Sequence, residues 1–398
     1  MAAAARAFCL SIHADYLCRH AGACCTSAWP IPVETPLVGV LRGAIASGRL
    51  KVPGADATDR RDPFLRPETL AAGTGGVLRA DAAGACVFYE RDSGLCAIHR
   101  RMGHEHLPSA CQHFPRICLL EPHAVFVTLS HFCPTVARLP FRTDVQLAVV
   151  PAPARLMGDL RAEGLDARVA LPPLVRPGLL ADRESYRAWE RFLIGTLGSE
   201  LTPEAVIARV SSVTERIRGW TPDAGPLGDA VAGAIGAGGA REATAPASAH
   251  RSVLAGSGGR GTPASAPRFA WMVEAHELVR GCIPAQWSTV PAPADLETVD
   301  ARFVAPSWPS LARPVRFYLG ARAFASWFAY QGHGLRTIVR FLEIALAVVR
   351  VEAARHAAAA GRPLDEALLA EAFRSADLLL AHLADPQELA HRCSEAEG

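Results

Sequence analysis

Cysteines are the residues of this chain whose type and spacing best suit chemistry. Nine of the eleven lie in the first 133 of 398 residues. Seven of these nine fall into three blocks and are the predicted metal ligands: Cys18, Cys24 and Cys25; Cys86 and Cys96; Cys111 and Cys133. Zinc and iron-sulfur clusters both accept thiolate sulfur. One structural zinc takes four ligands, so seven thiols predict a polynuclear site or a smaller site with bystanders.

The adjacent pair Cys24-Cys25 bears on the kind of metal. Neighbouring side chains on an extended backbone point to opposite faces, which hinders both from holding one small ion. The pair therefore favours two metals, or an iron-sulfur cluster approached from two sides. Zinc is also compatible with these thiolates and with His99 or His113 as further ligands. The choice between iron-sulfur and zinc stays open.

The compartment decides between metal ligation and disulfides. The segment MAAAARAFCLSIHADYLC is interrupted by His13 and Asp15 and is a poor match to a secretory signal. The most apolar run, 338–351, contains three charged residues, so no membrane span is predicted. We expect a cytoplasmic protein, where thiols stay reduced and clustered cysteines favour metal.

Two further points limit the interpretation. Free cysteine is often an inert core residue, and we interpret four cysteines as packing or surface residues: Cys9, Cys118, Cys282 and Cys393. The formal net charge is only +2. Nucleic-acid binders carry a strong basic excess on one face, so no nucleic-acid partner is predicted.

The elements that must position the N-terminal cysteines are short. Apolar spacing predicts one helix over 34–47, and strands are predicted over 125–130 and 145–150. The stretch Gly73-Thr74-Gly75-Gly76 is interpreted as a turn because no convincing strand precedes it. Residues 1–150 are therefore expected to form an irregular α+β metal-binding region held together by its ligands.

The rest of the chain is predicted to be mainly helical, which makes the fold class mainly α. Helical spacing marks a region over 151–235, where Thr202 is a suitable N-cap before Pro203, and a C-terminal region over 268–398. Between them, 236–267 is rich in Gly, Ala, Ser and Pro and is expected to be a flexible insertion.

Two long periodic stretches dominate the C-terminal region. The first covers 321–360, with breaks expected near Gly332 and Gly334, and the second covers 364–383. Their order along the chain predicts two antiparallel helices.

The cysteine blocks resemble those of the YkgJ-type family, which is described as zinc- or iron-chelating and carries a CxxCxxCC run followed by further cysteines. Cys18, Cys24 and Cys25 match the first, third and fourth cysteines of that run, while Ala21 stands at the second. His20 or Cys9 could supply the ligand that Ala21 lacks. Alternatively, no residue replaces it and the site has one ligand fewer.

Within this family, the stretch CVFYERDSGLCAIHRRMGHEHLPSACQHFPR at 86–116 and LSHFCPTVARL at 129–139 are similar to the flagellin lysine-N-methylase branch. The similarity covers 18–138. It implies transfer of a methyl group from S-adenosylmethionine to a lysine of a protein such as flagellin. Such an amine must first lose a proton. The sequence identifies no catalytic base. Tyr89, Glu90 and Asp92 are candidates only because they lie between Cys86 and Cys96, and the competing interpretation is that they are solvated surface residues.

Two functions follow as expectations. One is a metal-binding protein lysine N-methyltransferase. The alternative is a non-enzymatic metal-handling or redox-sensing protein in which Cys24 or Cys25 is labile.

Overall fold

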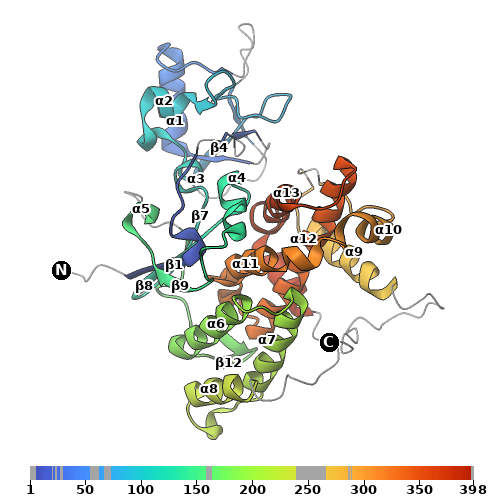
Figure 1. Cartoon of the computed structure of the whole chain (residues 1–398). Helices are drawn as coiled ribbons and strands as arrows, with labels where there is room; N and C mark the ends of the chain where they lie inside the picture. Colours follow the sequence, from blue (N-terminus) through green and yellow to red (C-terminus); the bar gives the residue numbers. More distant parts are fainter. Residues whose placement is uncertain are drawn as a thin grey trace.

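The chain has a mixed α+β fold with a helical C-terminal half (Figure 1). The computed structural model describes residues 6–19, 21–22, 25–26, 30–53, 62–66, 73–157, 164–238, 266–285, 287 and 289–395. Figure 1 shows a small unit with α1, α2 and β4 at the top, a sheet below it, and the helices to the right and at the bottom. None of the helices in these ranges is both long and apolar enough for a membrane span.

A five-stranded sheet lies at the centre of the N-terminal half. Its order is β10 (Leu165–Asp166), β7 (Arg116–Glu121), β8 (Ala124–Leu129), β1 (Arg6–Leu10) and β9 (Val149–Pro151). Strand β1 runs parallel to β8, with Phe8 opposite Phe126, and antiparallel to β9.

The two faces of this sheet bury different side chains because side chains alternate along a strand. Leu10, Leu119 and Phe126 belong to the large core shared with the helices, whereas Cys9 and Cys118 belong to a second core on the opposite face. The sheet thus joins the cysteine-rich region to the helical half.

The strand predicted over 125–130 is confirmed by β8, but that over 145–150 is confirmed only in its last residues. The carbonyls of Arg142 and Val145 accept hydrogen bonds from the Arg313 guanidinium, and that of Gln146 accepts one from the Ser11 hydroxyl. These side-chain contacts, and not strand pairing, hold the carbonyls of residues 142–146.

The unit at the top of Figure 1 holds a small separate core. Helix α1 (Thr35–Ala46), which confirms the helix predicted over 34–47, packs on a sheet of β2 (Pro32–Glu34), β4 (Thr74–Leu78) and β3 (Phe64–Leu65). The prediction of a turn at 73–76 is wrong beyond Gly73, because β4 starts at Thr74. A Cβ added to Gly75 would lie 2.8 Å from Thr35 Cα, so this glycine lets the strand approach the helix start.

Strands replace part of the helix predicted over 151–235. Residues 164–180 contain β10, β11 (Leu174–Arg176) and β12 (Leu179–Leu180). Pro172, Pro173 and Pro177 lie in this stretch, and proline breaks helices because it lacks an N–H. From there the prediction holds: α6 (Arg183–Leu197), α7 (Pro203–Arg218) and α8 (Leu227–Gly238) follow, and Thr202 Oγ1 accepts the Ala205 N–H at 3.2 Å as the α7 cap.

Helix α12 (Leu335–Ala360) is the centre of the C-terminal half and contacts each of its main neighbours. These are α7, α9 (Ala266–Gly281), α10 (Leu296–Val299), α11 (Ala312–Ala323), α13 (Glu366–Asp377) and α14 (Pro386–Glu395). The break predicted near Gly332 and Gly334 is confirmed between α11 and α12, and the predicted helix pair is α12 with α13. Most of the predicted insertion, 239–265, lies outside the described residues, while its ends belong to α8 and α9.

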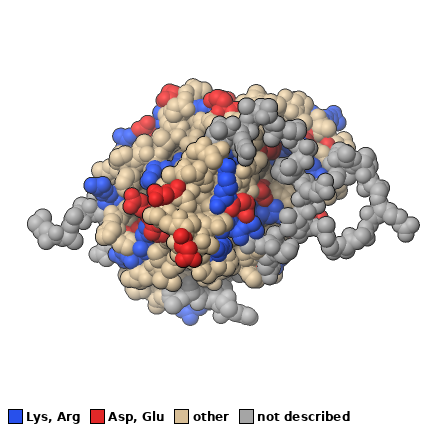
Figure 2. Space-filling model, turned by 90° about the horizontal axis from the view of Figure 1, so that it is seen from below, with Lys and Arg blue, Asp and Glu red and all other residues tan. Residues whose placement is uncertain are grey.

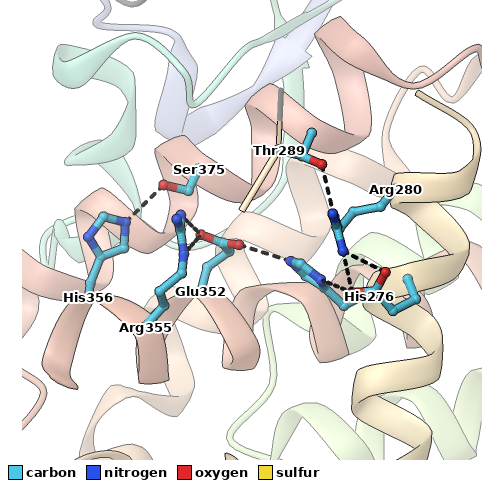
Figure 3. A network of polar contacts seen from close by, with 8 residues as sticks. His276, Arg280, Thr289, Glu352, Arg355, His356 and Ser375 are labelled. Carbon is cyan, nitrogen blue, oxygen red and sulfur yellow. Dashed lines mark hydrogen bonds and ion pairs between the residues drawn. The ribbon is translucent and has the colours of Figure 1, made fainter. Parts of the chain in front are cut away.

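A network of polar side chains links α9, α12 and α13 (Figure 3). The buried Glu352 carboxylate pairs with His276 Nε2 at 3.0 Å and with Arg355, and His356 contacts the Ser375 hydroxyl at 2.8 Å. Burial raises the pKa of Glu352, but its bonds to His276 and Arg355 outweigh burial and leave the pKa below its ordinary value. The charged carboxylate therefore binds helices together inside the core.

Candidate metal centre

The first two cysteine blocks meet through the backbone. The Cys86 N–H donates to the Cys25 carbonyl at 2.7 Å, and the Cys25 N–H donates to the Gly22 carbonyl at 2.8 Å. Gly22 has φ +69°, and an added Cβ would lie 2.7 Å from the Tyr89 hydroxyl oxygen. The loop that carries the first block therefore packs directly on the segment that carries the second.

Cys96 and Cys111 both pack on the small α1 core, Cys96 from a strand and Cys111 from a short helix. Cys96 pairs with Tyr89 in the hairpin of β5 (Tyr89–Glu90) and β6 (Leu95–Cys96) and precedes α2 (Ala97–Met102). Cys111 lies in α3 (Ser109–His113), whose Ser109 N–H donates to Glu34 Oε1 at 3.1 Å. Both thiols and that of Cys86 are half-buried against the small α1 core.

Cys18 and Cys133 meet at one tyrosine. The Tyr16 hydroxyl lies 3.9 Å from Cys133 Sγ and also interacts with the Cys18 thiol. Burial, followed by these two thiols, raises the pKa of Tyr16 far above its ordinary value. Cysteines 115 positions apart in the sequence (18 and 133) thus share one hydroxyl group.

The third block connects the two groups. The Phe114 and Phe132 rings lie edge to face at 6.2 Å, and the Ser130 N–H donates to the Pro115 carbonyl at 2.7 Å. The segment after Cys111 therefore lies against the segment before Cys133.

The predicted ligands are brought near one another in part only. Within the ranges that the structure describes, no three or more His, Cys, Asp or Glu side chains are arranged to hold a metal ion. Cys24 and His20 lie outside those ranges. His99 and His113 are the two predicted histidine ligands. The His99 ring contacts the His104 ring edge to face, with centroids 5.8 Å apart, and His113 is the last residue of α3.

The four cysteines predicted to be packing or surface residues are all buried: Cys9, Cys118, Cys282 and Cys393. Burial raises the pKa of Cys9, Cys118 and Cys282 to about 11 and that of Cys393 to about 12. These thiols stay protonated at neutral pH, which suits packing and not metal binding.

Of the acid and base candidates beside Cys86, Asp92 is exposed, whereas Tyr89 and Glu90 are half-buried. Glu90 accepts a hydrogen bond from the Ser93 hydroxyl at 2.8 Å and pairs with Arg100.

Charged side chains of both signs are interspersed on the face shown in Figure 2, with no continuous basic strip among the coloured residues of that face.

Sequence reasoning missed a buried polar group behind Cys133, which we name the Asp377 hub. It consists of Ser130, His131, Tyr318, Arg322, Asp377 and His382. The Asp377 carboxylate accepts from Ser130 Oγ at 3.1 Å, from the His131 N–H and from the Tyr318 hydroxyl at 2.9 Å, and it lies 3.3 Å from the Arg322 guanidinium. The one available signal was an acid on the apolar face of the helix predicted over 364–383.

Two histidine rings lie beside this hub. His13 and His131 are fully buried with ring centroids 5.7 Å apart, and neither ring has a hydrogen-bond partner among the residues that the structure describes. Burial lowers the pKa of both rings well below 6.5, helped by the Arg322 charge and, for His13, by His131 before it. Both imidazoles are therefore neutral at neutral pH.

Comparison of the chain with protein-family models, with curated proteins and with solved structures found no match.

Proposed function

We propose that this chain is a metal-binding protein that holds an iron-sulfur cluster or zinc through thiolates of its N-terminal region. The observation that carries the proposal is the pair of meetings between distant blocks: Cys18 with Cys133 at Tyr16, and Cys25 with Cys86 through the backbone. Thiolates drawn from separate stretches are what such a site requires.

The chemistry of the donors fits this proposal. Cys18 is exposed, and Cys25, Cys86, Cys96 and Cys111 are partly accessible, whereas Cys133 and the four cysteines predicted to be packing or surface residues are buried. A thiol near solvent loses its proton at a lower cost than one in an apolar core. Five candidate ligands thus differ from the packing cysteines in accessibility, whereas Cys133 is connected to the exposed Cys18 through the Tyr16 hydroxyl.

Replacing one candidate ligand tests the metal centre. Cys86→Ser is expected to leave about half or less of the bound metal, because it removes one thiolate from the site. The measurement is anaerobic purification followed by iron, zinc and acid-labile sulfide analysis. The matched control is Cys282→Ser, which should leave the metal content unchanged. Cys282 is buried, and its thiol donates a hydrogen bond to the Leu278 carbonyl at 3.3 Å. Equal losses in the two variants would refute the assignment.

We further propose that the activity is methyl transfer from S-adenosylmethionine to a lysine of a protein such as flagellin. Its support is the similarity of the segments at 86–116 and 129–139 to the lysine-N-methylase branch. In this activity the metal centre would fix the positions of the segments that carry the thiols. The exposure of Cys18 favours the second candidate, a non-enzymatic metal-handling or redox-sensing protein.

A methylation assay separates these two functions. Metal-loaded protein is expected to transfer a labelled methyl group from S-adenosylmethionine to purified flagellin, and Cys86→Ser is expected to transfer less. Flagellin with its lysine amines blocked is the control and should take up no label. Unlabelled flagellin with fully loaded protein would favour the metal-handling function.

A further inference from the structure

Tyr16 occupies an unusual place for a tyrosine. It follows a short helical turn, η1 (Ser11–His13), and its N–H donates to the His13 carbonyl at 3.0 Å. The ring is buried in the core on the far face of the sheet, together with Cys9, Cys118 and Val127. A tyrosine buried among apolar side chains usually has a hydrogen-bond partner for its hydroxyl.

The partners of the Tyr16 hydroxyl are thiols. Its oxygen lies 3.9 Å from Cys133 Sγ, and Cys18 is its other partner. A neutral thiol is a weak acceptor, so such a contact recovers little of the cost of burying an O–H group. A thiolate is a much better acceptor, because a hydrogen bond to a charged group is roughly twice as strong as one between neutral groups. The hydroxyl is therefore placed where it would stabilise charged sulfur.

We propose that Tyr16 is a positioning residue of the metal centre, whose single O–H proton is shared between the metal-bound sulfurs of Cys18 and Cys133 and holds them together. This inference rests on the proposed metal-binding function. Hydrogen bonds to ligand sulfur orient the ligands of a metal and tune its affinity, and in an iron-sulfur cluster they also raise its reduction potential.

Tyr16→Phe isolates the hydroxyl because the ring that packs in the core is kept. With Zn²⁺ as the probe, competition against a chromogenic chelator is expected to give an affinity about tenfold weaker than that of the unaltered chain. The matched control is Tyr186→Phe in α6, and its affinity should not change. It removes a buried hydroxyl for which the described part of the chain supplies no hydrogen-bond partner. If the protein holds an iron-sulfur cluster, its midpoint potential is expected to become more negative in Tyr16→Phe alone.

The outcomes separate this inference from the function on which it rests. Absence of zinc and iron binding in the unaltered chain would remove the proposed function. Binding with equal affinity in Tyr16→Phe would leave that function intact and overturn the role of Tyr16. Urea unfolding of the unaltered chain and of Tyr16→Phe, each with and without metal, tests for a folding defect. If Tyr16→Phe loses the same stability in both conditions, Tyr16 is a packing residue only.

Discussion

Asp377→Asn is expected to lower the free energy of unfolding by about 3–5 kcal/mol, the range for breaking a buried ion pair on one side. The carboxylate is fully buried and accepts from Ser130 Oγ, from the His131 N–H and from the Tyr318 hydroxyl. The amide would leave the Arg322 guanidinium without its charge partner in the core. Urea denaturation followed by circular dichroism measures the loss.

The same helix offers a matched control. Glu371 is partly exposed and pairs with Arg374 at 2.5 Å, and a surface pair of this kind contributes at most about 1 kcal/mol. Glu371→Gln should therefore change stability little. If Asp377→Asn were as mild as this control, the Asp377 hub would not be a stabilising element.

The hub also holds the loop that carries Cys133. Asp377 contacts Ser130 and His131, and the Arg374 guanidinium donates to the Phe132 carbonyl at 3.1 Å. We therefore expect Asp377→Asn to reduce metal content as well as stability, whereas Glu343→Gln, which breaks the partly buried pair with Arg340 in α12, should retain its metal.

Stability of the metal-free protein is expected to fall as the pH drops below 6.5, the ordinary pKa of histidine. Above pH 6.5, His13 is neutral in both the folded and the unfolded chain and contributes no pH dependence. Below it, the unfolded chain binds a proton that the folded chain excludes, so acid favours unfolding. At pH 5 this amounts to at most about 2 kcal/mol for one such imidazole.

The groups around His13 fix this sign. His131 and Arg322 oppose its protonation, Asp377 favours it, and burial outweighs them all. His382, whose pKa burial lowers to about 4, acts in the same direction.

Urea denaturation between pH 7 and pH 5, where few carboxylates titrate, measures the slope of stability against pH. This slope reports the number of protons that the chain takes up on unfolding. His13→Gln, which cannot titrate, should reduce that number by about one. The slope of Tyr186→Phe should equal that of the unaltered chain. An unchanged slope in His13→Gln would mean that His13 takes up its proton in the folded state.

The sequence predicted the long helices and the capped ends well because their signals are local. The α7 cap at Thr202 and the break before α12 follow from single residues and from apolar spacing. The sheet was largely missed because β1 and β10 are short and gain their partners from distant segments. Strand β10 has only two residues, which pair with β7 more than forty positions earlier in the chain.

The candidate site divides in the same way. Cysteine clustering separated the candidate ligands from four packing cysteines, all of which are buried, but it did not predict that the candidate ligand Cys133 is buried as well. The meeting of Cys18 with Cys133 at Tyr16 depends on the sheet, and the Asp377 hub depends on the packing of α11 and α13 against the loop at 130–133. Neither arrangement leaves a local pattern, so only the structure reveals them.

The place of β1 inside its sheet bears on how the protein is made. Its neighbours are residues 124–127 on one side and 149–151 on the other, all of which leave the ribosome long after Cys18 and Cys25. The chain must close a long loop before β1 can pair with these segments, so the early thiols stay exposed to solvent through much of translation. Under the proposed function, metal insertion is therefore timed by the arrival of β9 and not by the appearance of the first sulfur atoms.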